Sequence, residues 1–591
     1  MKQILAQVKQ YKRDSFLTPA FSALEVFMEV LLPFIMAKII DDGIEKGDMS
    51  KVYLYGGLMV LAAVVSLISG IMAGKFAASA SSGLACNLRE AIYRRIQRFS
   101  FSNIDKYSTA GLVTRMTTDV TNVQNAYQMC IRIAVRAPLM LISSMVMSFL
   151  VSPKMSFMFL FALIFLAAAL GFIMLKAMKL FDVAFRKYDD LNASVQENVS
   201  GIRVVKAYVR EDFEKNKFSK ASGNLYKLFT KAEGILAFNN PIMMLASYGT
   251  IIAISWVGAH LVVGGSLKTG ELTSMFTYVT SAFMSLMMLS MIFVMISMST
   301  ASIKRISEVL TEKSDLENPE KPVTEMKNGD IDFNNVTFAY HKGEGKEILK
   351  NIDLHIKSGE TIGIIGPTGC GKTSLVNLIS RLYDVKEGSV CVGGLDVRKY
   401  DMEYLRNQVS VVLQKNVLFS GTILENLRWG NENATDEECI EACKSACADE
   451  FISRFPEGYN TRIERGGANV SGGQKQRICI ARALLKKPKV LILDDSTSAV
   501  DTATDAKIRA EFAKKIPGTT KIIIAQRISS VQHADRILVL ENGCISGLGT
   551  HEELVESNEI YKEIYNSQTQ GGGDFDSPAP DNAENSGKEN E

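Results

Sequence analysis

The stretch Gly366-Pro367-Thr368-Gly369-Cys370-Gly371-Lys372-Thr373 decides the fold of the C-terminal half of this 591-residue chain. It has the full spacing of a phosphate-binding loop, and the β-branched run before it and the helical pattern from Ser374 onward are its expected flanks. Its glycines let backbone N–H groups converge on phosphates at a helix N-terminus, Lys372 reaches the outer phosphates, and Thr373 coordinates Mg²⁺. We therefore predict an α/β P-loop domain that binds ATP through Gly366, Thr368, Gly369, Cys370, Gly371, Lys372, Thr373 and Ser374.

Two further motifs follow the loop. Val490-Leu491-Ile492-Leu493-Asp494 is typical of a buried strand that delivers a carboxylate to Mg²⁺. Between the loop and this strand, Ser471-Gly472-Gly473-Gln474 opens a predicted helix and forms a second anion cradle. One chain cannot close two separate cradles on the same triphosphate, so the sequence predicts a second copy of the domain.

Composition excludes several classes of function. The chain has 66 Lys and Arg against 64 Asp and Glu, so no basic field indicates a nucleic-acid partner. Nine scattered cysteines indicate a reducing compartment rather than a disulfide framework. Cys439, Cys443 and Cys447 share one face of a predicted helix, and we interpret this face as buried rather than zinc-binding because no histidine lies nearby.

The N-terminal half is a membrane domain by its apolar content. Six segments are long enough to cross about 30 Å of hydrocarbon, at residues 17–40, 53–73, 131–150, 155–175, 238–263 and 272–298. The two long loops between them, at residues 74–129 and 176–235, are helix-patterned and carry nineteen basic residues. We therefore expect both loops and both termini to be cytoplasmic, with the spans extended as paired helices.

Two polar or polarisable features lie inside these spans. Glu25 and Glu29 share one face of the first span, where an ionised carboxylate needs water or a partner. They either form a cation-attracting or proton-coupled wall of a translocation cavity or make a structural bond between helices. Methionines recur at spacings of four and three in the sixth span, as a helix-packing stripe or an adaptable substrate surface: Met284, Met288, Met291, Met295 and Met298.

Over residues 10–565 the chain resembles an ATP-binding-cassette (ABC) exporter half-transporter, because six spans precede one cassette and the three motifs occur in order. The resemblance implies that Tyr340 stacks on adenine and that Gln414 links the Mg²⁺ site to the membrane helices. It also implies coupling helices near residues 104–111 and 208–212, and a loop crossing between paired cassettes at Ser498-Ala499-Val500-Asp501. The expected organisation is an all-α six-helix transmembrane domain (1–313), a linker (314–328), the nucleotide-binding domain (329–567) and a disordered acidic tail (568–591).

The sequence departs from the family at three places. The family has a glutamate after the Mg²⁺ aspartate to orient and deprotonate the attacking water, and this chain has Asp495, one methylene shorter. A displacement of about 1 Å can cost roughly a hundredfold in rate. The family's switch histidine is replaced by Gln526, which cannot carry the positive charge of a histidine. Glu464-Arg465-Gly466-Gly467 also has a one-residue offset from the usual pattern.

These departures resemble the degenerate-site subunit of heterodimeric bacterial multidrug exporters. The hypothesis is that this chain binds ATP with little turnover while Ser471–Gln474 completes a competent site on a non-identical half-transporter. That partner would carry the glutamate and histidine, and an imperfect signature. The assembly would export small amphipathic compounds or drugs across the cell membrane by alternating access. The alternatives are a homodimeric exporter of lipid or peptide and an ATP-gated channel or regulatory sensor.

Overall fold

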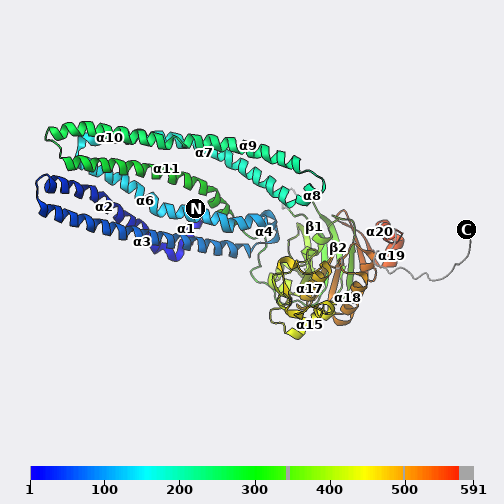
Figure 1. The fold of residues 1–591 in the computed structure, drawn as a ribbon. Helices are drawn as coiled ribbons and strands as arrows, with labels where there is room; N and C mark the ends of the chain where they lie inside the picture. The colour runs from blue at the N-terminus through cyan, green and yellow to red at the C-terminus, as the bar shows by residue number, and fades with distance from the viewer. Residues whose placement is uncertain (1, 341–345, 497–498, 571–591) are drawn as a thin grey trace, which may run out of the picture. The chain divides into compact units, whose positions relative to one another are not determined.

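The computed structural model describes residues 2–340, 346–496 and 499–570, and these form two compact units (Figure 1). Unit 1 comprises residues 1–98 and 107–313, and unit 2 comprises residues 99–106 and 314–591. Unit 1 is all-helical, and unit 2 contains every described strand. The predicted fold class, a helical membrane domain followed by an α/β P-loop domain, is confirmed.

Unit 1 is built from long helices that run alongside one another (Figure 1). Short helical turns lie at their ends and between them. The helical elements are α1 (Lys2–Leu5), η1 (Ala6–Tyr11), α2 (Lys12–Lys38), η2 (Ile39–Ile44), α3 (Met49–Ile96), α5 (Thr109–Thr114), η3 (Arg115–Asp119), α6 (Val120–Val151), α7 (Pro153–Ser200), α8 (Ile202–Ala207), α9 (Glu211–Leu236), α10 (Asn239–Val263) and α11 (Thr269–Thr311).

Five described helical segments are long and apolar enough to cross a membrane by length and composition. They are Met49–Ile96, Thr109–Val151, Pro153–Ser200, Glu211–Val263 and Thr269–Thr311. The first predicted span forms helix α2, whose 27 residues are long enough to span but include Glu25 and Glu29. Helix α3 has 48 residues and is about 72 Å long, more than twice the hydrocarbon thickness. The predicted long extensions beyond the spans are therefore present.

The two loop tips differ from the prediction in detail. The first contains α4 (Phe101–Lys106), which belongs to unit 2, and then α5. The second contains α8, which ends at Ala207, so the short helix precedes the predicted residues 208–212. Val209 has φ 52°, and this left-handed residue stops the helix before α9 begins at Glu211.

Small residues on α3 let this helix pack closely against its neighbours, among them η1. Ala73, Ala77 and Ala80 on α3 are fully buried. A Cβ on Gly83 would lie 2.3 Å from a ring carbon of Tyr11, so the ring occupies the space that a side chain would need.

Unit 2 contains a six-stranded sheet and a four-stranded sheet. The six-stranded sheet has the order β12-β11-β3-β10-β9-β6, and all neighbouring pairs except β11 with β12 are parallel. The four-stranded sheet, β2-β1-β4-β5, is antiparallel. The strands are β1 (Ile331–Phe338), β2 (Leu349–Ile356), β3 (Thr361–Ile365), β4 (Glu387–Val392), β5 (Leu395–Asp396), β6 (Val409–Val412), β7 (Gly421–Thr422), β8 (Arg462–Ile463), β9 (Val490–Asp494), β10 (Thr520–Ile524), β11 (Arg536–Glu541) and β12 (Cys544–Gly549).

Helices of unit 2 connect these strands and complete the domain. They are α4, α12 (Lys372–Ile379), η4 (Val397–Lys399), α13 (Met402–Gln408), α14 (Ile423–Leu427), α15 (Asp436–Ser445), α16 (Asp449–Ile452), η5 (Gly458–Asn460), η6 (Arg465–Gly467), α17 (Gly472–Leu484), α18 (Thr502–Lys515), η7 (Ile528–Ser530), α19 (His551–Ser557) and α20 (Glu559–Gln570). Helix α20 includes residues 568–570, so the predicted disordered tail starts three residues too early. Residues 571–591 lie outside the described residues.

Cys439 and Cys443 lie on α15, whereas Cys447 follows the end of that helix, so the predicted helix is too short to carry all three. All three cysteines lie in an apolar core. Cys439 and Cys443 are fully buried, and Cys447 is nearly so. Burial raises the pKa of all three thiols, which keeps them protonated and unreactive. Within the described ranges, no group of three or more His, Cys, Asp or Glu residues could hold a metal ion.

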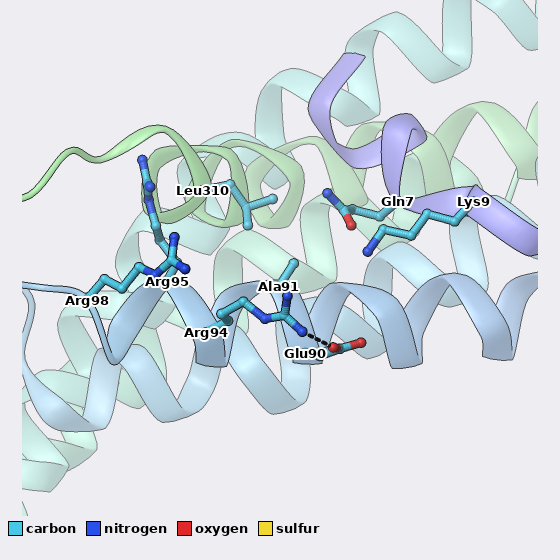
Figure 2. Close-up of a pocket in the computed structure, with 8 residues that line it drawn as sticks. All are labelled: Gln7, Lys9, Glu90, Ala91, Arg94, Arg95, Arg98 and Leu310. Atoms are coloured by element: carbon cyan, nitrogen blue, oxygen red, sulfur yellow. Dashed lines mark hydrogen bonds and ion pairs between the residues drawn. The ribbon is translucent and has the colours of Figure 1, made fainter.

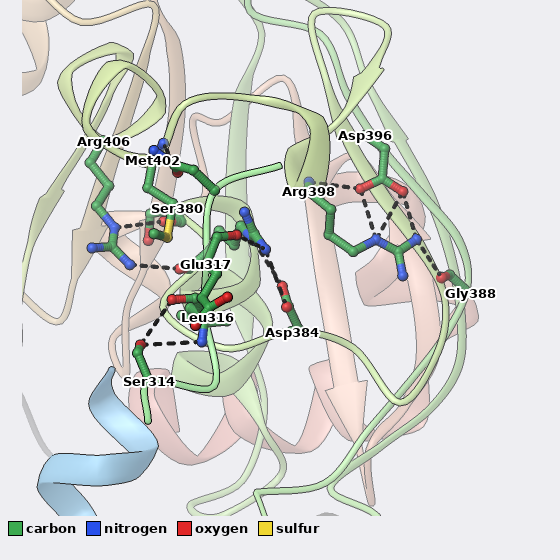
Figure 3. A network of polar contacts seen from close by, with 12 residues as sticks. Ser314, Leu316, Glu317, Ser380, Asp384, Gly388, Asp396, Arg398, Met402 and Arg406 are labelled. Carbon is green, nitrogen blue, oxygen red and sulfur yellow. Dashed lines mark hydrogen bonds and ion pairs between the residues drawn. The ribbon is translucent and has the colours of Figure 1, made fainter. Parts of the chain in front are cut away.

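Polar contacts around Glu317 and Ser380 anchor the segment at the start of the predicted linker (Figure 3). Arg381 donates to Asp384 at 3.0 Å and to the carbonyl oxygen of Glu317 at 3.3 Å. Arg406 in turn donates to the carbonyl oxygens of Ser380 and Arg381. These bonds fix the start of the predicted linker against the first helix after the phosphate loop.

Candidate functional site

The phosphate loop connects β3, an interior strand of the six-stranded sheet, to α12. Gly366 has φ 152°, and a Cβ there would lie 2.1 Å from the carbonyl oxygen of Leu540. Gly371 has φ 105° and forms the N-cap of α12. The loop therefore requires glycine at both positions, and it presents backbone N–H groups at the helix N-terminus.

Lys372 lies back over its own loop. Its Nζ donates to the carbonyl oxygens of Gly366 at 2.8 Å and Pro367 at 2.9 Å. The ammonium is thus held at the position where the loop would receive phosphate oxygens, and its flexible stem allows it to exchange these partners. This arrangement fits the predicted phosphate-binding role.

Thr373 and Asp494 meet beside the loop. The Thr373 hydroxyl donates to both carboxylate oxygens of Asp494, at 3.2 and 2.9 Å. Asp494 is buried at the end of β9, and burial raises its pKa, partly offset by the bond from Thr373. A hydroxyl and a carboxylate are hard oxygen ligands, and the pair fits Mg²⁺.

The two residues that depart from the family pattern contact each other. The Gln526 side-chain amide donates to Asp495 Oδ2 at 3.0 Å, and the Asp495 carboxylate is also hydrogen-bonded by Gln414. Burial raises the pKa of Asp495, and the two amide side chains lower it in part. Asp495 has φ 49°, a left-handed conformation that aspartate tolerates. The structure thus brings together Gln414, Asp495 and Gln526, which are far apart in the sequence.

Helix α20 fixes the segment that carries Gln526. Gln568 donates to the carbonyl oxygen of Gln526 at 2.8 Å and accepts from the backbone N–H of Ile528 at 2.8 Å. The sequence assigned Gln568 to a disordered tail, so this contact was missed. A short helical pattern with Ile560 and Ile564 on one face was the available signal.

Tyr340 lies in an aromatic cluster. Its hydroxyl hydrogen-bonds the Ser374 hydroxyl at 2.8 Å, and its ring packs edge-on against Phe338 and Tyr383. Tyr340 remains 38% exposed, so one part of the ring is open to a ligand. Residues 341–345, which follow it, lie outside the described residues.

Tyr383 connects this cluster to α4. Its hydroxyl donates to Asp105 at 2.7 Å, and its ring packs against Phe101. Burial and the bond to Asp105 both raise the pKa of Tyr383, so it stays protonated as a donor. Asp105 lies in the coupling helix predicted near residues 104–111, but sequence reasoning missed Tyr383 and the bond between them because nothing local links residues almost three hundred positions apart.

The second cradle, Ser471–Gln474, is a well-formed helix start. Ser471 accepts from the backbone N–H of Gln474, and the Gln474 side chain accepts from the N–H of Ser471. Gly473 packs where a Cβ would lie 2.7 Å from the carbonyl oxygen of Ala499. Ser471 and Gly472 are exposed, so the cradle faces away from the core of its own domain. Ser498 in the neighbouring loop is outside the described residues.

Glu25 and Glu29 have a partner that the sequence analysis missed. Arg136 on α6 binds both carboxylate oxygens of Glu29, at 2.7 and 2.8 Å, and lies 3.6 Å from Glu25. Glu25 Oε2 is buried without a hydrogen-bond partner. The structural bond between helices is therefore present, and it leaves two carboxylates sharing one guanidinium. The signal was an arginine inside the third predicted span.

Part of the methionine stripe lies on the surface of unit 1. Met284, Met288 and Met291 are 40–66% exposed, and Met295 is partly buried. The side chain of Met298 is outside the described set. These exposed side chains do not pack in the core of unit 1, so they are free to contact lipid, a second subunit or a transported molecule.

Together, a phosphate loop, an adjoining oxygen pair and a helical membrane domain define a membrane-bound P-loop ATPase. Residues 16–287 match the family described as ABC transporter transmembrane region, and residues 349–498 match the family described as ABC transporter. The chain belongs to the ABC transporter family, with a membrane domain and an ATPase domain on one polypeptide.

Several curated relatives align over almost the whole chain. It is 37% identical to the uncharacterized ABC transporter ATP-binding protein YfiB of Bacillus subtilis over 96% of this chain and 98% of the relative. It is 33% identical to the uncharacterized ABC transporter ATP-binding protein MT1311 of Mycobacterium tuberculosis, over 95% and 97%. A solved structure of a bacterial Atm1-family ABC exporter with ATP bound has a TM-score of 0.80, covering 96% of this chain and 99% of that one at 24% identity. The fold is thus that of an ABC exporter.

Proposed function

We propose that this chain is one half of a heterodimeric exporter that uses ATP to move small amphipathic compounds across the cell membrane. The chain binds ATP at its own phosphate loop with slow turnover. Its Ser471–Gln474 segment closes over ATP held by a non-identical partner. The hydrogen bond between Gln526 and Asp495 is the observation that carries the proposal.

The phosphate loop supplies binding and orientation. Backbone N–H groups of the loop surround the inner phosphates, and Lys372 exchanges its two carbonyl partners for outer phosphate oxygens. Thr373 and Asp494 would hold Mg²⁺, which when bound neutralises charge on the outer phosphates. Tyr340 presents the open part of its ring to adenine.

The weak step is activation of the attacking water. In this chain Asp495 is a methylene shorter than the family's glutamate, and its carboxylate is engaged by Gln414 and Gln526. Gln526 donates a neutral hydrogen bond and offers no positive charge to the outer phosphate. A poorly placed base and a missing charge each reduce the rate of hydrolysis without removing the binding site.

The opposite site would depend on the exposed cradle. Ser471 and Gly472 face solvent, and the capping box leaves the helix start formed and rigid. A triphosphate on a facing domain would receive the N-terminal dipole of α17. The ATPase domains would close around two nucleotides, and preferential binding of ATP to the closed state would drive the membrane helices to the outward-facing state.

The substrate class is inferred from the membrane helices. Glu25 and Glu29 share Arg136, and a pair of carboxylates in a membrane helix favours a cationic or amphipathic compound. The exposed methionines Met284, Met288 and Met291 offer a polarisable surface that adapts to varied shapes.

The test is to purify the chain alone and with each candidate partner, and to measure Mg²⁺-dependent ATP hydrolysis. We expect the lone chain to hydrolyse ATP slowly and the correct pair to hydrolyse it at least tenfold faster. Ser471→Ala in this chain is expected to slow the pair because that residue serves the partner's site. Rapid hydrolysis by the lone chain that Asp495→Asn abolishes would contradict the proposal and favour a homodimeric exporter.

A second measurement separates a pump from an ATP-gated channel or sensor. Inside-out vesicles that contain the pair are expected to accumulate a cationic dye only with hydrolysable ATP. Ion current that persists with a non-hydrolysable analogue, without dye accumulation, would identify a channel instead.

A further inference from the structure

A pocket of about 290 Å³ lies in unit 1, between η1, the end of α3 and the end of α11 (Figure 2). Its walls come from three segments that are far apart in the sequence. The residues that line it are Gln7, Lys9, Glu90, Ala91, Arg94, Arg95, Arg98 and Leu310. We call this cavity the basic pocket. It contains none of the residues of the phosphate loop.

The charges around the basic pocket are unbalanced. Four lining residues are basic and one, Glu90, is acidic. Glu90 is paired with Arg94, one helical turn away on α3 (Figure 2). Among the residues that the structure describes, Lys9, Arg95 and Arg98 have no acidic partner. The pocket therefore holds a net charge of three positive units from its own side chains.

Two polar atoms in the wall are unsatisfied. Arg95 Nε, a donor, and Gln7 Oε1, an acceptor, are both buried from solvent without a hydrogen-bond partner. A buried polar atom without a partner loses its hydrogen bonds to water and gains none in return, so such atoms indicate a ligand or water in the cavity. The Arg95 donor suits a negatively charged oxygen, and the neutral Gln7 acceptor suits a hydroxyl group. The two atoms together suit an anion that also carries a hydroxyl.

The backbone at the pocket is unusual. Lys9 has φ 42° and ψ −114° inside η1, a conformation that lysine rarely adopts. This break redirects the chain, and the Lys9 side chain lies over α3 near the paired Arg94 and Glu90 (Figure 2). Strained residues of this kind persist where the surrounding structure holds them and often mark a binding site.

The position of the pocket along α3 decides the source of the anion. Arg94 follows the predicted span 53–73 by 21 residues, or about 31 Å of helix. This is as long as the whole hydrocarbon core, so the headgroup of a bilayer lipid lies out of reach. The small volume also excludes a macromolecular ligand.

We propose that the basic pocket binds a small, soluble phosphorylated anion through Lys9, Arg95 and Arg98. Arginine forms paired hydrogen bonds with phosphate oxygens. Arg95, in the last turn of α3, and Arg98, two residues beyond its end, can therefore hold a single diphosphate group. The bound anion would join η1, α3 and α11, and so bias the arrangement of these three helices.

The experiment uses pyrophosphate as the probe and the full chain in nanodiscs of zwitterionic lipid. The background variant Lys372→Ala removes phosphate binding at the nucleotide loop, and EDTA removes Mg²⁺. Calorimetric titration is expected to show one saturable site. Arg95→Gln with Arg98→Gln, and separately Lys9→Gln, should weaken binding at least tenfold. Lys220→Gln, an exposed charge on α9, is the matched control and should leave binding unchanged.

Each other outcome would overturn the proposal. If pyrophosphate binding does not saturate, or if Lys220→Gln weakens it as much as the pocket variants do, the positive charge attracts anions without forming a site. Lys9 is exposed, so Lys9→Gln tests the site even if the double arginine variant fails to fold. If nanodiscs of anionic lipid block pyrophosphate binding, the anion is a lipid headgroup and the soluble source is wrong. The background variant is impaired at the nucleotide loop, so failure here is independent of the proposed export function.

Discussion

At the scale of single residues, two departures from the family pattern compensate for each other. Asp495 and Gln526 differ from the family pattern, and they hydrogen-bond to each other at 3.0 Å. A histidine at position 526 would place a positive charge next to the shorter carboxylate. The glutamine amide instead donates a hydrogen bond to this carboxylate and carries no charge. The pair is therefore a stable arrangement in its own right, and restoring only one member would leave the other mismatched.

The double substitution Asp495→Glu with Gln526→His should raise ATP turnover of the lone chain at least tenfold. The longer carboxylate reaches the attacking water, and the histidine supplies a positive charge to the outer phosphate. Steady-state ATPase assays of the single and double variants would measure this. A double variant no faster than the original chain would show that hydrolysis is limited elsewhere.

The Glu29–Arg136 pair gives a second prediction at this scale. Glu29→Gln removes the ion pair with distances of 2.7 and 2.8 Å and leaves Arg136 only the Glu25 contact at 3.6 Å. We expect a loss of about 1–2 kcal/mol, the range of polar contacts between membrane helices. Thermal unfolding of the detergent-solubilised chain measures it, with the exposed Glu45→Gln as control.

The charge swap Glu29→Arg with Arg136→Glu provides the complementary check. It should recover part of the lost stability because the pair is restored with its direction reversed. An equal melting temperature in the original chain and Glu29→Gln would mean that the pair contributes nothing.

At the scale of elements, α4 is the important connection. It is a six-residue helix from the first long loop, yet it belongs to the compact unit that contains the ATPase domain. Tyr383 bonds Asp105 of α4 and packs on Tyr340, the proposed adenine residue. Ser102 of α4 also donates to Asp315 at 2.8 Å. Tyr383 therefore connects the Tyr340 ring directly to α4 within unit 2.

A double-mutant cycle tests this connection. Tyr383→Phe and Asp105→Asn should each weaken the docking of α4 by about 1 kcal/mol, and the double variant should cost no more than one of them. Hydrogen exchange of residues 99–106 reports the docking. Additive effects would show that the bond does not couple the two elements. Ser108→Ala, in the same loop but not on α4, is a control for general loop damage.

At the scale of the whole molecule, the chain forms two compact units, and α4 from the first long loop belongs to the second of them. Ser471 and Gly472 at the start of α17 and the exposed methionines of α11 are surfaces that one subunit leaves uncovered. Unsatisfied cradles and apolar surfaces of this kind are expected in a subunit that works only when paired.

ATP without Mg²⁺ should stabilise the chain through linkage. At a ligand concentration of one hundred times Kd, the gain is about 2.7 kcal/mol. Thermal unfolding with and without ATP measures it, and Lys372→Ala should remove most of the gain because the ammonium no longer reaches the phosphates. Thr519→Ala, remote from the loop, is the control. An equal gain in Lys372→Ala would place ATP at another site.

Local patterns determined much of this protein. The glycine spacing of residues 366–373, the β-branched run before the loop and the apolar spans each specify their element through short-range physics. Strand β3 directly precedes the loop, and β9 forms at the predicted residues 490–494. Contacts between distant residues required the folded chain. Arg136 beside Glu29, Tyr383 beside Asp105 and Gln568 beside Gln526 join positions 42–278 residues apart. No periodicity encodes such pairs, because they depend on how whole elements pack.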